Sequence, residues 1–425
     1  MKAYSQMSKT ERQAALAAAE ADYEALRELG LSLNIARGKP GREQLDLVSP
    51  MMDLLRSDSD YLCDGIDVRN YGNLEGLPAC RKLFADLLGV RPEQVFVGGN
   101  ASLLLMYQVI AAAFLSGVRG EPWSRAEKVR WLCPAPGYDR HFKISESFGM
   151  ELVTVPMTPE GPDMDLVEEL IRDEAVKGMW CVPKFSNPDG IVYSEETVRR
   201  IAAMKPAAED FLLMWDNAYC VHEFATDFIP FPDILSACES VGNGDMVFEF
   251  ASTSKITFPG AGVSCFACSE KNLARMVKLL TVQIISYDKV NQLRHVRYLK
   301  DREGVLALMR KHAGILAPKF ACVLGMLERE IAPLGIASWE KPVGGYFISV
   351  NVLPGTAMET WRLCRDAGLT LTKAGASYPY GKDPQDSNIR VAPTLPPVGQ
   401  LEQAMQIFCA AMKLAALRKL TAEAE

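Results

Sequence analysis

The chain has 425 residues, of which 48% are hydrophobic, so it can form two or three domains with large buried cores. Its net charge of −7 argues against a general nucleic-acid or membrane-surface binder, which would carry a basic face. We expect a folded, cytoplasmic protein.

Cysteines and histidines do not form a metal-binding pattern. The 11 cysteines are scattered, mostly in apolar runs, and we expect reduced, buried thiols. Cys265 and Cys268 make one C-x-x-C pair in a chain with only four histidines, so we predict no metal site. The longest apolar run, 101–118, is shorter than the ~20 residues of a membrane span, and we predict no membrane contact.

The first two-thirds of the chain predict an α/β sheet. Residues 9–29 have helical spacing, and an irregular stretch with Gly38, Pro40 and Gly41 follows at 34–47. Apolar strands then alternate with helices, which is typical of a mostly parallel sheet covered on both faces. The expected helices are 76–88, 101–116, 140–148, 163–175 and 195–204. The seven expected strands are 94–99, 129–133, 151–157, 178–183, 211–216, 246–251 and 263–269.

The last third has a different pattern. Long helices are expected to about residue 331, then strands at 345–352, 369–374 and 388–393, and a closing helix at 398–424. We predict an N-terminal segment (1–50) packed on a small α/β C-terminal domain (306–425), with a large domain between them (51–305).

Four features follow predicted strands, where open α/β sheets bind ligands. Gly98-Gly99 precedes a helix that begins near Ala101-Ser102, which suits an anion but also fits an ordinary helix start. Asp216 ends an apolar strand, where a carboxylate needs a cation or a donor, or caps a helix. Asn187 precedes Pro188, as in a turn, or donates to a ligand oxygen.

The fourth feature is Lys255 in "FASTSKITFPGAG" (250–262). Burial at a strand end lowers the pKa of an amine and makes it a nucleophile, although in isolation a surface lysine beside a Ser/Thr loop is the more common explanation. Taken together, an anion cradle, an aspartate, an asparagine and a lysine indicate a phosphorylated, cationic aromatic aldehyde that is held covalently.

The order of these motifs resembles the fold-type I pyridoxal-phosphate (PLP) enzymes of the aspartate aminotransferase superfamily, from about residue 30 to 410. The runs "NIARGKP", "PAPGYDRHF" and "NPDGIVYS" resemble the bacterial MocR-like aspartate aminotransferase subgroup. The resemblance implies a PLP-transferase fold of two domains and a homodimer with shared active sites.

The resemblance also implies roles for single residues. Lys255 would be the Schiff-base lysine and proton carrier, and Asp216 would hold the protonated pyridine nitrogen. Asn187 and Tyr219 would donate to the phenolic oxygen. The other implied cofactor contacts are the stacking Tyr138, the phosphate contacts Asn100, Ala101, Ser102, Ser252 and Ser254, and Tyr71, which would reach the phosphate of the partner subunit.

For the substrate, the resemblance implies that Arg390 clamps the α-carboxylate, together with Asn187 and the backbone of Gly38. Three cations are candidates for a distal carboxylate, each with the alternative of a plain surface charge: Arg37, Lys39 and Lys289. One position departs from the family, because Val263 replaces an arginine that normally pairs with the phosphate.

The expected activity is transfer of the amino group of L-aspartate to 2-oxoglutarate, with the cofactor alternating between its two forms. A PLP-dependent lyase, a decarboxylase or an aminotransferase of other specificity stays open, since the fold hosts many reactions. A PLP-sensing regulator is a minor alternative. Only about 30 residues, without a basic cluster, precede the aminotransferase-like part, so we expect no DNA-binding domain.

Overall fold

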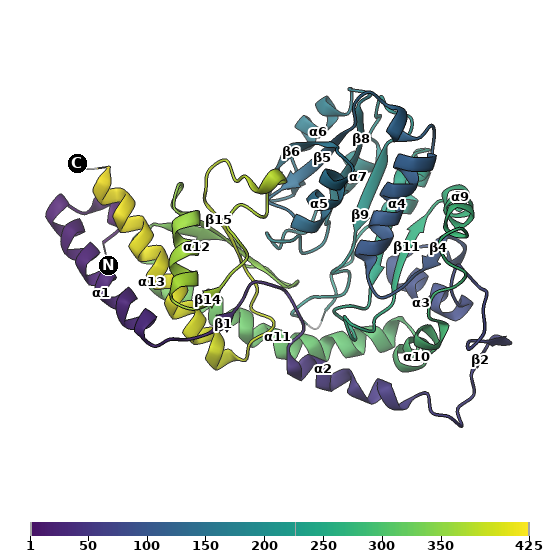
Figure 1. Cartoon of the computed structure of the whole chain (residues 1–425), viewed down its shortest axis with the longest axis horizontal. Helices are drawn as coiled ribbons and strands as arrows, with labels where there is room; N and C mark the ends of the chain where they lie inside the picture. The colour runs from purple at the N-terminus through teal and green to yellow at the C-terminus, as the bar shows by residue number, and fades with distance from the viewer. Residues whose placement is uncertain (1, 226, 424–425) are drawn as a thin grey trace.

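The structure is a computed structural model that describes residues 2–225 and 227–423. The chain forms two lobes of unequal size, a large one built on the main sheet and a small one that holds both ends of the described chain (Figure 1). The long helix α11 (Arg302–Glu330) runs along the base from one lobe into the other.

An eight-stranded sheet forms the large lobe, in the order β4-β11-β10-β9-β8-β5-β6-β7. The five central strands, from β10 to β6, pair in parallel, and β4, β11 and β7 add antiparallel edges. The strands are β4 (Val95–Val97), β5 (Arg130–Ala135), β6 (Glu151–Thr158), β7 (Gly161–Pro162), β8 (Val176–Cys181), β9 (Leu212–Asp216), β10 (Val247–Ser252) and β11 (Ser264–Cys268).

Helices cover both faces of this sheet because its strands are apolar on both sides. Leu212 and Met214 face a core with α4, α5 and α9, whereas Leu213 and Trp215 face a core with α6, α7 and α8. The helices of the large lobe are α3 (Pro78–Leu88), α4 (Ser102–Ser116), α5 (Asp139–Ser147), α6 (Met164–Leu170), α7 (Glu195–Ala202), α8 (Ile234–Ser240), α9 (Glu270–Leu280) and α10 (Lys289–Leu299).

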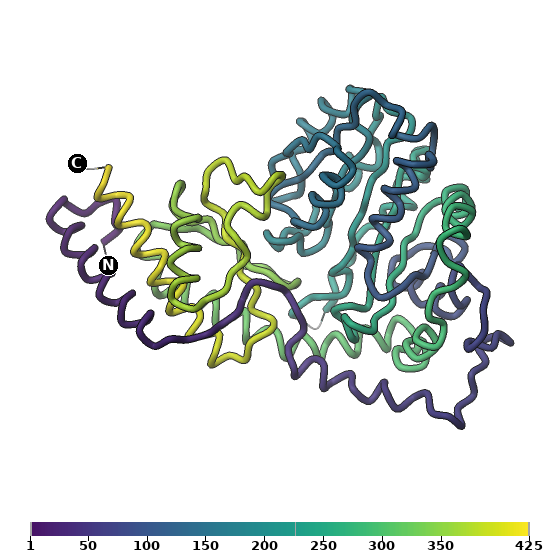
Figure 2. Tube along the Cα trace, in the orientation of Figure 1, coloured from purple at the N-terminus to yellow at the C-terminus, as the bar shows by residue number. Residues whose placement is uncertain are grey.

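The small lobe has a three-stranded antiparallel sheet, β12-β13-β15, and one continuous core that also includes Tyr23 of the first helix. Figure 2 shows the N-terminal helix beside the C-terminal one, after which the chain runs along the base to the far lobe. The elements are α1 (Lys9–Glu28), β1 (Leu33–Asn34), β12 (Ala337–Trp339), β13 (Ile348–Val352), α12 (Ala357–Asp366), β14 (Leu369–Thr370), β15 (Asn388–Val391) and α13 (Val398–Ala422).

The predicted elements differ from the structure at several points. The stretch 34–47, predicted to be irregular, contains α2 (Arg42–Val48), because the side chain of Gln44 accepts from the N–H of Gly41 and stabilises the start of a helix. The predicted strand 369–374 is only two residues long and pairs with β1 instead of the main small sheet.

Other differences concern element ends. Helix α6 stops at Leu170 instead of 175, and the seven predicted strands gain an eighth, β7, which is a two-residue hairpin partner of β6. Residue 424, the expected end of the last helix, lies outside the described residues. Within 2–225 and 227–423, no helix is long and apolar enough to cross a bilayer.

Candidate active site

A cavity of about 670 Å³ lies at the carboxyl ends of the central strands, between the two lobes. This position follows from the topology, because parallel strands bring their carboxyl ends to one edge of the sheet. Thirteen of the predicted site residues line it: Arg37, Gly38, Lys39, Ala101, Ser102, Tyr138, Asn187, Asp216, Tyr219, Ser252, Ser254, Lys255 and Arg390.

Asp216, the last residue of β9, is 4% exposed and caps no helix. Its Oδ2 lies 3.0 Å from Nε2 of His141, whose ring stacks on Trp180 with centroids 4.4 Å apart. The other oxygen, Oδ1, is buried and has no hydrogen-bond partner among the described residues. A buried carboxylate oxygen without a partner is costly, so this atom is suited to a donor that the ligand brings.

Lys255 lies in a turn after β10, where the carbonyl of Thr253 accepts from the N–H groups of Ile256 and Thr257. Its Nζ lies 4.7 Å from the centre of the Tyr219 ring and 5.8 Å from that of Tyr346. Burial lowers the pKa of Lys255 because the ammonium is desolvated, and the nearby carboxylate of Asp216 only partly opposes this effect. The amine is therefore primed to act as a nucleophile and a base.

Arg390 extends from β15 of the small lobe toward the large lobe. Its Nη1 donates to Oδ1 of Asn187 and to Oδ1 of Asp139, each at 3.1 Å, and its Nη2 donates to Thr372. The buried Nε has no partner among the described residues. Because Oδ1 of Asn187 accepts from Arg390, the amide nitrogen of Asn187 faces the ligand space as a donor.

Two tyrosines line the base of the cavity. Burial raises the pKa of Tyr138 to about 12 and raises that of Tyr219 as well, so both stay protonated and can donate a hydrogen bond. Tyr138 precedes α5 and lies edge-on to His141, with ring centroids 4.9 Å apart.

The predicted phosphate contacts lie together at the start of α4. Ala101 is its N-cap residue and Ser102 its first residue, and no side chain caps its free N–H groups. The Oγ atoms of Ser252, the last residue of β10, and Ser254 lie 3.1 Å apart. Asn100 lies just outside, since its side chain donates to Pro259 and only its carbonyl accepts from Ser254.

Val263, at the position where the resemblance implied an arginine, has its side chain buried in the core between α3 and the sheet. Its N–H donates to Oγ1 of Thr253 at 2.9 Å. This position therefore contributes to packing and to the shape of the lysine turn, and it brings no charge to the cavity.

Residues 36–39 of the N-terminal segment form one wall of the cavity. A Cβ at Gly38 would lie 2.7 Å from the ring of Phe347, so only glycine allows this approach. The same ring lies 4.9 Å from the guanidinium carbon of Arg390. Thr372 donates to the carbonyl of Ala36, which ties the segment to the small lobe.

Besides Asn100, two more predicted residues lie outside the cavity of their own chain. Tyr71 is 79% exposed, and Lys289 donates to the carbonyl of the adjacent Gly72 at 2.8 Å. Burial lowers the pKa of Lys289. Any contact of Tyr71 or Lys289 with a cofactor or substrate would therefore have to be made in a second copy of the chain.

Sequence reasoning missed several residues of the site. His141, Arg140 and Lys373 all contact or line it. His141 could have been found from its spacing, since a residue three positions after Tyr138 in a short helix lies on the same helix face as Tyr138. Lys373 had no such signal, because it lies in a loop where a strand was expected.

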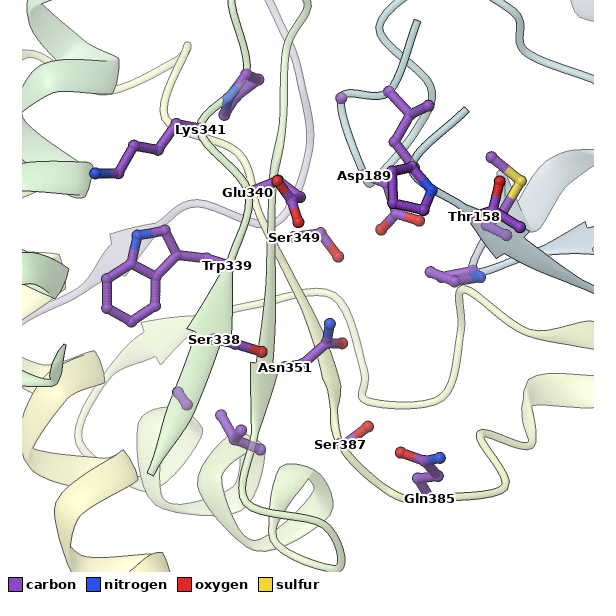
Figure 3. A pocket seen from close by; sticks show the side chains of 18 of the residues that line it. Thr158, Asp189, Ser338, Trp339, Glu340, Lys341, Ser349, Asn351, Gln385 and Ser387 are labelled. Atoms are coloured by element: carbon purple, nitrogen blue, oxygen red, sulfur yellow. The ribbon is translucent and has the colours of Figure 1, made fainter. Parts of the chain in front are cut away.

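A second cavity, of about 930 Å³, opens between the lobes beyond Asn187. Figure 3 shows Asp189 facing Ser349 and Glu340 across it, with Lys341 directed away. Burial raises the pKa of Asp189 to about 7, the Ser349 hydroxyl lowers it in part, and Glu340 adds to the rise. A carboxyl group thus lies between the lobes, two residues along the chain from Asn187 of the first cavity.

The family "Aspartate amino-transferase" matches residues 7–424. An aspartate aminotransferase of Corynebacterium glutamicum is 48% identical over 396 residues, which cover 93% of this chain and 92% of that protein. The crystal structure of an aspartate transaminase from the same species has a TM-score of 0.96 at 45% identity and covers 98% of this chain and 99% of that one.

A more distant structure shares the fold. An α-aminoadipate aminotransferase of Thermus thermophilus, complexed with N-(5'-phosphopyridoxyl)-L-leucine, has a TM-score of 0.75 at 22% identity and covers 92% of this chain and 93% of that one. Three features of the cavity fit the three polar ends of PLP. They are the free Oδ1 of Asp216, the lowered pKa of Lys255 and the uncapped N–H groups at the start of α4. The chain therefore belongs to the aspartate aminotransferase family and is a fold-type I aminotransferase that uses pyridoxal phosphate.

Proposed function

We propose that this aminotransferase takes the amino group of L-aspartate and passes it to 2-oxoglutarate, in two half-reactions that share one site. The observation that supports a dicarboxylate is an excess of cations around the mouth of the cavity. Besides Arg390, four exposed cations line it and have no ion pair among the described residues: Arg37, Lys39, Arg140 and Lys373.

In this proposal the floor of the cavity holds the cofactor. Asp216, oriented by His141, would keep the pyridine nitrogen protonated, and Asn187 and Tyr219 would donate to the phenolic oxygen. PLP supplies an electron sink for the bonds at the substrate Cα. Lys255 would bond to the cofactor at rest and, once displaced by the substrate amine, its Nζ would carry the proton from the Cα.

Charge complementarity supports the choice of substrate. The guanidinium of Arg390 offers two N–H donors in one plane, which suits the α-carboxylate. Its hydrogen bonds to Asp139 and Asn187 hold it in place. A distal carboxylate would then face the unpaired cations of the mouth. Arg140 directly follows Asp139 and Lys373 directly follows Thr372, so two of the three residues that accept hydrogen bonds from Arg390 are next to such a cation.

Phosphate binding in this proposal does without an arginine at position 263. The N–H groups at the start of α4 and the hydroxyls of Ser102, Ser252 and Ser254 would surround the phosphate. Tyr71 of a second subunit would complete the group. This division of the contacts fits the buried position of Val263 and the exposure of Tyr71.

A half-reaction spectrum tests the substrate assignment. The purified holoenzyme is titrated with aspartate, glutamate, 2-aminoadipate, alanine and leucine, while the absorbance of the lysine-bound cofactor is followed. We expect the dicarboxylic amino acids to convert the band at concentrations about tenfold lower than alanine or leucine. Equal efficiency with leucine would contradict the role of the mouth cations.

Product analysis separates transamination from the other reactions of this fold. Aspartate and 2-oxoglutarate should yield oxaloacetate and glutamate in equal amounts. Alanine with carbon dioxide would indicate a decarboxylase, and fumarate with ammonia a lyase. Either result would replace the proposed reaction while leaving the cofactor site intact.

We also propose a homodimer in which Tyr71 of each subunit enters the site of the other. Its support is the distance of Tyr71 and Lys289 from their own cavity. Mixing inactive Lys255→Ala and Tyr71→Ala subunits should restore about a quarter of wild-type activity, because half of the dimers then carry one intact site. Mixtures that stay inactive under conditions of subunit exchange would exclude shared sites.

Three narrower assignments stay predictions: membership in the MocR-like subgroup, a cytoplasmic location, and the domain boundaries 1–50, 51–305 and 306–425. For the boundaries, limited proteolysis is the appropriate measurement. Helix α11 begins at Arg302, close to the predicted boundary at 305/306, and it contributes to cores in both lobes.

A further inference from the structure

Gln44, in the helix that the sequence did not predict, lies at the centre of a buried hydrogen-bond network. It has no exposed surface, and its Oε1 accepts from the N–H of Gly41 at 3.1 Å. Its Nε2 lies 3.0 Å from Nδ1 of His312, a residue 268 positions away, and 3.0 Å from the hydroxyl of Tyr346. Three parts of the chain therefore meet at one amide.

The contacts of Gln44 define the tautomer of His312. Because the N–H of Gly41 can only donate, the oxygen of Gln44 faces it and the amide nitrogen faces His312. The Nδ1 of His312 must then accept, so the proton is on Nε2. That nitrogen lies 3.0 Å from the carbonyl of Ile256, to which it donates. Burial lowers the pKa of His312, in agreement with a neutral ring.

One end of this network is the turn that carries Lys255. The carbonyl held by His312 belongs to Ile256, the next residue along the chain. The hydroxyl of Tyr346 accepts from Gln44, and its ring lies 5.8 Å from the Nζ of Lys255. The network therefore contacts both the backbone next to the lysine and an aromatic wall beside the amine.

The other end is the N-terminal segment that lines the cavity. Gly41 follows Arg37, Gly38 and Lys39, all of which line the cavity. The carbonyl of Lys39 accepts from Thr394 at 2.8 Å, which fixes the segment directly before Gly41. The position of the segment over the cavity and the position of the lysine turn are thus connected through two side chains.

We propose that Gln44 and His312 form a positioning pair that couples the N-terminal segment at the cavity mouth to the turn of Lys255, a role that rests on the proposed function of Lys255 as the cofactor lysine. Neither side chain lines the cavity. Their effect is on the orientation of Nζ, by way of the Ile256 carbonyl and the Tyr346 ring. When the N-terminal segment contacts a substrate, Gln44 and His312 keep the Nζ of Lys255 in a fixed position relative to that substrate.

Nitrogen NMR of the histidines tests the geometry directly. The chain has four histidines, so selective ¹⁵N labelling gives a spectrum simple enough to assign by substitution. In the holoenzyme we expect His312 as the pure Nε2–H tautomer, with a pKa below that of an ordinary histidine because the ring is buried. In Gln44→Glu a carboxylate replaces the donor, so His312 should gain a proton on Nδ1 and titrate at higher pH.

Kinetics test the role. Gln44→Met should lower kcat about tenfold with less than a twofold change in KM, and shift the apparent pKa of the lysine-bound cofactor by about half a unit. Gln94→Met is a matched control. Gln94 is also buried, its Oε1 accepts from the N–H of Arg91, and its Nε2 donates to a side chain, Glu239, far from the cavity. It should change neither quantity.

Two results would overturn the proposal. One is a wild-type His312 that is protonated on Nδ1, because the derived network would then not exist. The other is a Gln44→Met enzyme with the kcat and cofactor titration of Gln94→Met. If Gln44→Met does not fold, Gln44→Glu, which keeps the size and the acceptor, takes its place in the same comparison.

The substrate assignment does not affect this test. The NMR experiment needs no substrate, and the kinetics use whichever amino acid converts the cofactor band fastest. A failure with aspartate alone would therefore count against the proposed substrate and leave the positioning pair to be judged by its own measurements.

Discussion

The floor and the mouth of the cavity are built in opposite ways. On the floor, Asp216 and Asn187 are almost fully buried, and each has a partner within 3.1 Å. At the mouth, Arg37 and Lys373 are exposed and have no ion pair among residues 2–225 and 227–423. The floor follows strand ends within one rigid sheet, whereas the mouth consists of loops and an N-terminal segment. The proposed cofactor contacts therefore lie at the end of the sheet, and the proposed contacts to a distal carboxylate lie on loops and on the N-terminal segment.

The same substitution at the floor and at the mouth should give the largest contrast. Lys255→Ala should remove the absorbance of the lysine-bound cofactor and lower activity by more than about 10³-fold. Lys373→Ala should keep the band and raise the KM for aspartate about tenfold. Absorbance spectra and steady-state kinetics are the measurements. A Lys255→Ala enzyme with normal turnover would refute the assignment of the floor.

A smaller contrast is expected for two aspartates. Asp216→Asn should lower kcat about 10²-fold, because an amide does not stabilise a proton on the ring nitrogen. Asp139→Asn should leave kcat within about threefold and raise KM, since Asp139 only orients Arg390. Steady-state kinetics of both variants check this order. A larger loss of kcat in Asp139→Asn than in Asp216→Asn would contradict the assignment of Asp216 as the residue that binds the ring nitrogen.

The lowered pKa of Lys255 predicts a chemical difference between lysines. Below pH 10.5 a lysine with a lowered pKa has a larger neutral fraction, so in the cofactor-free protein the rate of reductive methylation at Lys255 should reach its own plateau at a lower pH than that of a free lysine side chain. Each rate is compared with its own maximum, so that restricted access to the buried amine cancels. Mass spectrometry of peptides measures the rates between pH 7 and pH 11, and a plateau at Lys255 that is reached no earlier than in a lysine-containing peptide would contradict the effect of burial.

Asp189, between the lobes, should give the smallest effect. Its pKa is raised from 3.8 to about 7, so the unfolded chain loses this proton first and stability falls as the pH rises through that window. Asp189→Asn removes the penalty, and its Tm should exceed that of the wild type by about 2 °C at pH 8, with the gain vanishing toward pH 4. The exposed Asp53→Asn serves as the control, and an equal gain there would mean that burial of Asp189 is not the cause.

The sequence by itself determined the floor of the site. Buried strands leave a strong apolar pattern, and a polar residue that ends such a strand, as Asp216 does, or that follows one, as Asn187 and Lys255 do, stands out against it. The topology then brings these ends together, because parallel strands share one edge. The fold class, the cofactor and the aminotransferase activity followed from these positions and from the resemblance that they carry, and the comparisons confirmed them.

Only the tertiary structure decided the connections between distant residues. Arg390 meets Asn187 across 203 positions, Gln44 meets His312 across 268, and His141 meets Asp216 across 75. A hydrogen bond of this kind leaves no periodic trace in a sequence, since either partner alone is an ordinary polar residue. Lys373 and Arg140 could be identified as cations of the mouth only in the structure, for the same reason. The role of a charged side chain depends on the groups around it, and the fold determines which groups those are.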